Sequence, residues 1–86
     1  MIVNVKVTQA LIDTGDPCNP YGCPIVVAIT NALPGSVVGV TNREIAIMIN
    51  GINQFIVPPW TVTQFVNAYD NDRPVQPFEF ELEVNE

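Results

Sequence analysis

The sequence predicts a single α+β domain over residues 1–86, a small sandwich in which an antiparallel-rich sheet carries two helices on one face. Three observations predict it. Apolar and polar residues alternate near both ends of the chain, which is the period of a half-buried strand. Two internal stretches carry helix boundary signals, and an Asn-Gly pair between apolar runs favours a tight hairpin. The expected order is β-α-β-β-(β)-α-β, for which a split βαβ arrangement of the ferredoxin-like kind is the natural topology.

The N-terminal quarter of the chain predicts a strand, a short helical turn and a loop. Residues 2–7 alternate valines with Asn and Lys, so they are expected to form the first strand. Thr8 can cap a helical turn over residues 9–13, and Gly15 can end it. Residues 16–22 are rich in Pro, Asn and Gly and therefore predict a loop.

Residues 24–33 form the first expected helix. Pro24 fits the first turn of a helix, where its missing N–H costs nothing, and Pro34-Gly35 would end the helix. The run between these signals is rich in β-branched residues, so a buried strand is the alternative. We favour the helix because both boundaries carry helix signals.

The middle of the chain predicts a hairpin. Residues 37–40 and 45–49 are apolar runs with strand character. Asn50-Gly51 follows, and both residues tolerate the positive φ of a type I′ turn. Residues 52–57 then form the returning strand, which Pro58-Pro59 closes.

A second helix and a last strand complete the expected fold. Thr61 and Gln64 match a capping box at the start of a helix over residues 61–70. Residues 78–84 alternate almost without fault, with three glutamates facing water. The apolar residues expected to face the core are Val62, Phe65, Val66 and Tyr69 in the helix, and Phe78, Phe80, Leu82 and Val84 in the strand.

The composition excludes several classes of function. The chain carries 9 acidic and 3 basic residues, a net charge of −6, and no histidine. Such a surface repels phosphates, so we do not expect direct binding of DNA or RNA. Histidine is the commonest general base and metal ligand, and no catalytic motif replaces it, so we expect neither an enzyme nor a bound cofactor or metal. There is no signal-peptide pattern and no apolar stretch of roughly 18 residues, so we expect a cytoplasmic protein that does not enter a membrane.

Three stretches in fixed order resemble a group of short, uncharacterised proteins encoded by bacteriophages and bacteria. In that group a "VT…I…G" opening, a "CP-I/V-A-x-A" helix start and a "V-x-PF-x-F" final strand recur. This chain departs from the pattern at Val26, where the group has alanine, and in its longer loop before Cys23. The resemblance implies a phage or mobile-element setting and an accessory role, and it carries over no functional residue. The matching residues are Val7-Thr8 with Ile12 and Gly15, Cys23-Pro24-Ile25 with Ala28-Ile29, and Phe65 and Asp70 with residues 74–80.

The two cysteines, Cys18 and Cys23, are separated by four residues across the expected loop. Zinc needs about four N or S ligands, and the chain holds no other Cys or His to supply them. The spacing also differs from the two-residue gap of thioredoxin-like motifs. Cys23 precedes a helix N-terminus, whose partial positive charge favours a thiolate. A buried capping residue is the favoured interpretation of Cys23, with a loop disulfide to Cys18 and a reactive thiol as alternatives.

The last strand carries a row of like charges. Glu79, Glu81 and Glu83 share one face and stand roughly 6.5–7 Å apart along it. Such a row could imitate a phosphate backbone, as inhibitors of nucleic-acid enzymes do. The favoured interpretation is an ordinary solvated strand face whose charge discourages edge-to-edge aggregation.

Two aromatic residues are candidates for contact with a partner. Trp60, together with Phe55 and the Pro58-Pro59 step, could form an exposed apolar patch, although packing of Trp60 at the end of the core is favoured. Tyr21 lies at the tip of the expected loop next to a glycine. Loop aromatics in that setting are rarely buried, so Tyr21 is the better candidate for an exposed anchor.

Taken together, the residues predict a small non-enzymatic protein of the phage accessory type that acts in the host cytoplasm by binding an unknown protein. Such binding could inhibit a host or defence factor. Two alternatives stay open: a thiol-dependent redox protein centred on Cys23, and a structural protein that self-assembles through its apolar sheet edge, so a homo-oligomer is one expectation. The residues singled out as contacts are Tyr21, Cys18, Cys23, Trp60, Glu79, Glu81 and Glu83.

Overall fold

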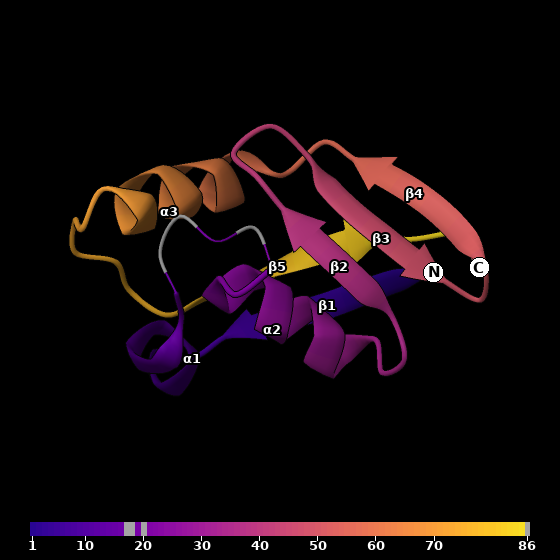
Figure 1. The fold of residues 1–86 in the computed structure, drawn as a ribbon, viewed down its shortest axis with the longest axis horizontal. Coiled ribbons are helices and arrows are strands. Elements are labelled where there is room, and N and C mark those ends of the chain that lie inside the picture. Colours follow the sequence, from indigo (N-terminus) through magenta and orange to yellow (C-terminus); the bar gives the residue numbers. More distant parts are fainter. Residues whose placement is uncertain (17–18, 20, 86) are drawn as a thin grey trace.

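The computed structural model describes residues 1–16, 19 and 21–85. Within those residues, five strands and three helices follow one another in the order β-α-α-β-β-β-α-β (Figure 1). The α+β class and the order of elements that the sequence predicts are therefore confirmed. The elements are β1 (Ile2–Val7), α1 (Gln9–Thr14), α2 (Pro24–Ala32), β2 (Val37–Val40), β3 (Ile45–Ile49), β4 (Ile52–Ile56), α3 (Trp60–Asp70) and β5 (Phe78–Glu83).

The strands divide between two antiparallel sheets, where the sequence suggested one. The two ends of the described chain form the first sheet, in which β1 pairs with β5 from Ile2 opposite Glu83 to Val7 opposite Phe78. The second sheet is a meander in the order β2-β3-β4. Because β1 pairs only with β5 among the described residues, the arrangement is not a split βαβ sheet. Alternation identifies which face of a strand is buried, but it does not say which edges meet.

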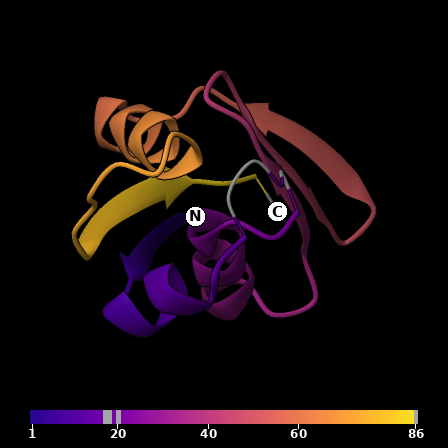
Figure 2. The same ribbon diagram turned by 60° about the vertical axis from the view of Figure 1, so that its left-hand side comes forward.

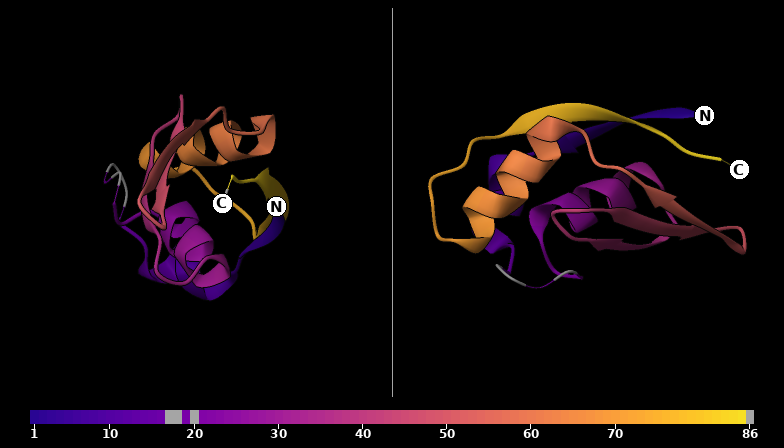
Figure 3. Two further views of the ribbon diagram at one scale, coloured as in Figure 1. Left: turned by 90° about the vertical axis from the view of Figure 1, so that its right-hand side faces the viewer. Right: turned by 90° about the horizontal axis from the view of Figure 1, so that it is seen from above.

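The two sheets face each other across one core, and the helices close its sides. Seen end-on, the meander and the β1–β5 pair lie on opposite sides, with α2 and α3 on the two remaining sides (Figure 3, left). The sequence suggests two helices together on one face of a single sheet. In the structure the two helices lie on different sides of the core. Figure 2 shows the same separation from another angle. The inward strand residues include Val5, Val7, Phe80 and Leu82 from one sheet and Val38, Val40, Ile45 and Ile47 from the other.

The β-branched run after Pro24 is helical, as its boundary signals indicate. Pro24 occupies the first turn of α2, and the preceding Cys23 is the N-cap residue. Ile25 and Ile29 stand one turn apart and are both fully buried, with 0% of each exposed. Gly35 follows the helix with φ of 87°, a conformation that suits glycine. Burial of one helical face outweighs the strand propensity of these residues.

The expected hairpin forms around Asn50 and Gly51. Their φ angles are 52° and 78°, so both central residues are left-handed, as a type I′ turn requires. Ile49 stands opposite Ile52 on either side of the turn. The returning strand β4 ends at Ile56, one residue before the end that the sequence suggested.

The start of α3 differs from the expected capping box. The N-cap residue is Pro59, the helix begins at Trp60, and no side chain caps it. Thr61 therefore lies inside the first turn and not at the cap position. The reason is that Pro59, with φ of −56° and ψ of 153°, is the last residue outside the helix, so the helix begins one residue before the threonine. The apolar stripe of the helix is buried as expected.

Gly15 allows α1 to approach α3. The hydroxyl of Tyr69 donates a hydrogen bond of 2.9 Å to the carbonyl of Ile12 at this contact. A Cβ on Gly15 would lie 2.6 Å from that hydroxyl oxygen, so glycine is needed for space and not for a left-handed φ. At the other end of α1, Thr8 accepts a hydrogen bond of 3.3 Å from the Leu11 amide, which confirms the expected cap.

Gln54 joins the two sheets. Its side chain points inward and is only 9% exposed. The amide nitrogen donates to the Asn85 carbonyl, and the amide oxygen accepts a hydrogen bond of 2.7 Å from the Asn85 N–H. One side chain thus supplies both bonds of a ladder rung, and it holds the segment after β5 against β4 without a strand pairing between them.

Candidate protein-binding surface

Among the described residues, the surface of the meander that faces away from the core carries no charged side chain. Strand residues alternate between faces, so the buried Val38 and Ile47 have neighbours that point outward. In the register of the sheet, these outward neighbours stand in two cross-strand rows. We define the outer face as Tyr21 together with the residues of these rows: Val37, Gly39, Ala46, Met48, Asn53 and Phe55.

The large apolar side chains of the outer face are strongly exposed. Tyr21 is 74% exposed, Phe55 71% and Val37 64%. Single exposed apolar residues are common on proteins, but a contiguous group of them marks an interaction surface. The exposure of Tyr21 agrees with its expected position as a loop anchor.

A hollow of about 170 Å³ lies on the outer face. Gly39 and Ala46 stand opposite each other in the register and bring only small side chains to the middle of the face. Tyr21, Val37 and Phe55 also line the hollow and are far larger. Pockets for small organic ligands measure about 300–1,000 Å³. The size of this hollow therefore suits the insertion of one side chain better than a whole small molecule.

Much of this surface comes from a segment of the sequence without charged residues. From Ile45 to Tyr69 the sequence contains no Asp, Glu, Lys or Arg, although the chain as a whole has a net charge of −6. The turn between β2 and β3 holds the nearest charges in sequence, Arg43 and Glu44. This charge-free segment is the sequence signal for Ala46, Met48, Asn53 and Phe55, whereas Tyr21, Val37 and Gly39 lie outside it.

The glutamate row lies on the outward side of the other sheet. Glu79, Glu81 and Glu83 are exposed, and their inward neighbours Phe80 and Leu82 are buried. The Lys6 ammonium lies 3.8 Å from the Glu79 carboxylate, and both side chains are more than half exposed. An ion pair in that setting contributes little to stability. The row has the geometry of a solvated strand face.

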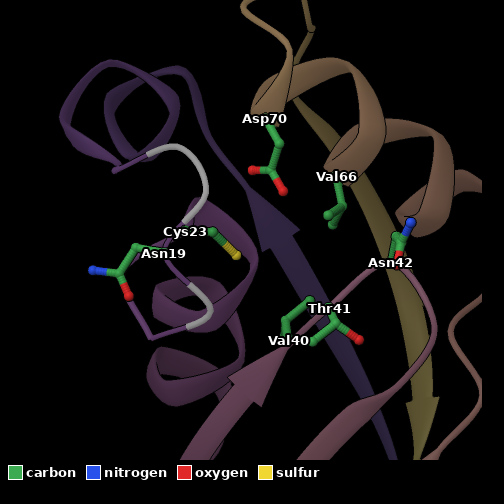
Figure 4. Close-up of a pocket in the computed structure, with 7 residues that line it drawn as sticks. All are labelled: Asn19, Cys23, Val40, Thr41, Asn42, Val66 and Asp70. Atoms are coloured by element: carbon green, nitrogen blue, oxygen red, sulfur yellow. The ribbon is translucent and has the colours of Figure 1, made fainter.

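A second hollow, of about 260 Å³, lies where the start of α2 approaches the end of α3. Figure 4 shows the Cys23 sulfur and the Asp70 carboxylate pointing toward the space between these helices. Nearby, the Asn42 side chain donates a hydrogen bond of 3.1 Å to Asn67. The lining residues are Asn19, Cys23, Val40, Thr41, Asn42, Val66 and Asp70.

The environment of Cys23 disfavours a thiolate. Burial raises the pKa of the Cys23 thiol above its usual value, and the residue is only 5% exposed. The backbone amides of Val26 and Ile25 lower that pKa, but burial outweighs them, and the charge of Asp70 raises the pKa further. Cys23 is a free cysteine, whereas Cys18 lies outside the described residues. The geometry matches the favoured interpretation of Cys23 as a buried residue at a helix start.

The sequence favours packing of Trp60 at the end of the core, and this prediction is wrong. Trp60 is 70% exposed, because it is the first residue of α3 and the buried stripe of that helix begins at Val62. The structure does not gather the candidate contacts into one site. Tyr21 shares a hollow with Phe55, whereas Cys23 and Glu79 each line another one.

Among residues 1–16, 19 and 21–85, no group of three or more His, Cys, Asp or Glu side chains could hold a metal ion. In the same residues, every helix is too short or too polar to cross a lipid bilayer.

Comparison with models of known protein families, with curated proteins and with solved structures finds no match to this chain.

Proposed function

We propose that this protein acts by binding another protein through the outer face. The observation that carries the proposal is the exposed, charge-free group of Tyr21, Val37, Met48 and Phe55 around a hollow of about 170 Å³. Desolvating apolar side chains drives most protein association, and charged residues are depleted at the centres of such interfaces. The partner is expected to present an apolar side chain that enters the hollow.

Other classes of ligand fit this face less well. A nucleic acid would require basic side chains, and the segment from Ile45 to Tyr69 has none. An enzyme would require a positioned acid, base or nucleophile, and the outer face holds only Tyr21 and Asn53 as polar side chains. The redox alternative centred on Cys23 lacks an exposed, acidified thiol.

The setting belongs to the proposal as well. The resemblance to short phage and bacterial proteins supports an accessory role in the host cytoplasm. A non-enzymatic protein of this size would act there by occupying a surface of its target.

The test is a capture experiment with matched variants. The wild-type chain, Met48→Lys and Glu81→Gln would each be immobilised and exposed to a bacterial lysate. Both changed residues are exposed strand positions, so circular dichroism should report intact folding for both variants. We expect at least one protein to be retained by the wild type and by Glu81→Gln and to be lost with Met48→Lys. Retention of the same proteins by Met48→Lys would contradict the proposal.

Tyr21 provides a quantitative version of the test on any protein so captured. Its ring is 74% exposed in the free chain and would be buried in the complex. Tyr21→Ala should weaken the affinity by about 2 kcal/mol or more, as expected for an aromatic hot spot. Titration calorimetry would measure the change, and an unchanged affinity would remove Tyr21 from the interface.

A further inference from the structure

We propose that two copies of this chain pair edge to edge through β4, in an antiparallel contact with Phe55 opposite Phe55 of the second copy. The contact is distinct from the binding function of the outer face, because it involves the backbone of the outermost strand of the meander. Figure 1 shows β4 at the rim of the molecule, with β3 on its only paired side.

The turn at Asn50-Gly51 determines which backbone groups of β4 point outward. In a two-residue hairpin the residues flanking the turn, Ile49 and Ile52, exchange both hydrogen bonds. Pairs then alternate, so Asn53 and Phe55 direct their N–H and C=O groups away from β3. Outside the sheet pairing, neither residue makes a backbone hydrogen bond to any part of the described chain. This edge therefore presents a row of donors and acceptors to solvent.

The edge also lacks the features that normally prevent strand addition. Proteins protect exposed edges with charged side chains, prolines or bulges. Between Ile52 and Val57 the strand has no charge and no proline, and its register with β3 runs without interruption. The β1–β5 sheet of the same molecule carries Lys6 and the glutamate row. One sheet is thus protected by charge and the other is not.

A second copy is the partner that best fits this edge. An antiparallel pair of identical strands satisfies both edges at once, since each outward N–H meets an outward C=O of the same pattern. With the twofold axis at Phe55, Asn53 stands opposite Val57 of the second copy, which uses all three outward residues. Val57 is 85% exposed in the single chain. The two Phe55 rings lie side by side, an arrangement that favours cross-strand pairing.

Two copies of the chain repel each other least when they approach through this edge. Two chains of net charge −6 repel each other, but no charged side chain lies between Ile45 and Tyr69. The contact would extend the meander into one continuous sheet of two β2-β3-β4 units and place the two outer faces next to each other. A single strand pair buries a small area, so we expect a reversible, concentration-dependent dimer that strengthens as added salt screens the repulsion.

The experiment uses charge exchange at the twofold axis. Sedimentation velocity of the wild type should show a shift from monomer to dimer as its concentration rises to about 1 mM. Phe55→Lys alone and Phe55→Glu alone should each remain monomeric, because the axis places like charges directly opposite. An equimolar mixture of the two variants should dimerise again, with opposite charges now facing each other. Phe55 is 71% exposed, so both variants should fold, which circular dichroism would check.

Met48→Lys and Met48→Glu supply the matched control. Met48 belongs to the outer face but lies on the central strand, so either variant should dimerise like the wild type while losing the protein partner proposed above. A wild type that stays monomeric up to about 1 mM overturns the dimer. So does a mixture of the two Phe55 variants that fails to associate. A dimer lost equally with the Met48 variants would assign self-association to the outer face and not to the edge.

Discussion

The two sheets of this molecule are alike on their inner sides and opposite on their outer sides. Both contribute fully buried aliphatic side chains to one core, such as Val5 from β1 and Ile45 from β3. Outward, the β1–β5 pair carries the glutamate row, whereas the meander presents Val37, Met48 and Phe55. Strand alternation makes this possible, because the outer positions can change without disturbing the inner ones.

The two outer faces therefore differ in the contacts that they can make. The inner faces form the core that stabilises the fold, and the outer faces are available for contacts with other molecules. A charged outer face keeps molecules apart and in solution. An uncharged, apolar outer face costs solubility, and its presence is therefore best explained by a contact that covers it.

The largest expected effect tests the equivalence of the two inner faces. Phe80 packs against Phe78 with ring centroids 5.6 Å apart, and Ile47 is 1% exposed on the opposite sheet. Phe80→Ala should lower the free energy of unfolding by about 3–5 kcal/mol and Ile47→Ala by about 2–5 kcal/mol, because each empties a core site. Urea denaturation would measure both. A loss below about 1 kcal/mol for either variant would show that its sheet does not share the core.

The next effect concerns the connection between the sheets. Gln54→Ala removes both bonds to the Asn85 backbone and leaves those groups without their partner, which should cost about 1–3 kcal/mol. Asn53→Ala is the matched control, since its exposed side chain makes no such bond, and it should change the stability by less than about 0.5 kcal/mol. Thermal unfolding of the two variants would compare them. Equal losses would mean that Gln54 does not hold the sheets together.

A smaller loss of stability is expected in alkaline solution, and it depends on the burial of Cys23 between α2 and α3. Burial raises the pKa of the Cys23 thiol, so the unfolded chain releases this proton at lower pH than the folded chain does. The folded state then holds more protons, and stability should fall above about pH 9 by up to about 1.4 kcal/mol per pH unit. Denaturation from about pH 7 to about pH 10 would show the slope. Cys23→Ser should flatten it, and an unchanged slope in that variant would assign the effect to other groups.

The smallest expected effect lies on the charged outer face. Replacing Glu79, Glu81 and Glu83 together by Gln relieves repulsion between like charges and removes one exposed ion pair with Lys6. These contributions are small and opposite in sign, so the free energy of unfolding should change by less than about 1 kcal/mol. Urea denaturation at low and high salt would measure it. A large loss would show that the glutamates stabilise the fold, which a solvated face does not do.

Much of the fold could be predicted because it depends on local signals. Pro24 and Pro34-Gly35 indicate a helix against the strand propensity of the residues between them, and Asn50-Gly51 indicates the turn that the structure contains. The division into two sheets could not be predicted. It depends on which strand edges meet, and alternation in β5 is the same whether its partner is β1 alone or a longer sheet.

The candidate surface was predicted only in part. Tyr21 was identified correctly as exposed, because a loop aromatic next to glycine has nowhere to pack. The sequence places Met48 and Val37 in strands. Only the register of the sheet shows that their side chains share one outward face with Phe55. Trp60 is expected from the sequence to close the end of the core beside the second helix. The helix starts at this residue and turns it outward.

The pairing of β1 with β5 also determines the order in which this protein can fold. The meander closes through short turns, whereas joining β1 to β5 requires residues 8–77 to form one closed loop. By the logarithmic law of loop closure, that step costs about 3 kcal/mol more entropy than a two-residue turn. The meander is therefore expected to form early and the β1–β5 pair late, when the intervening chain has already become compact. By this argument, the charged sheet is expected to assemble last, and its closure would complete the core.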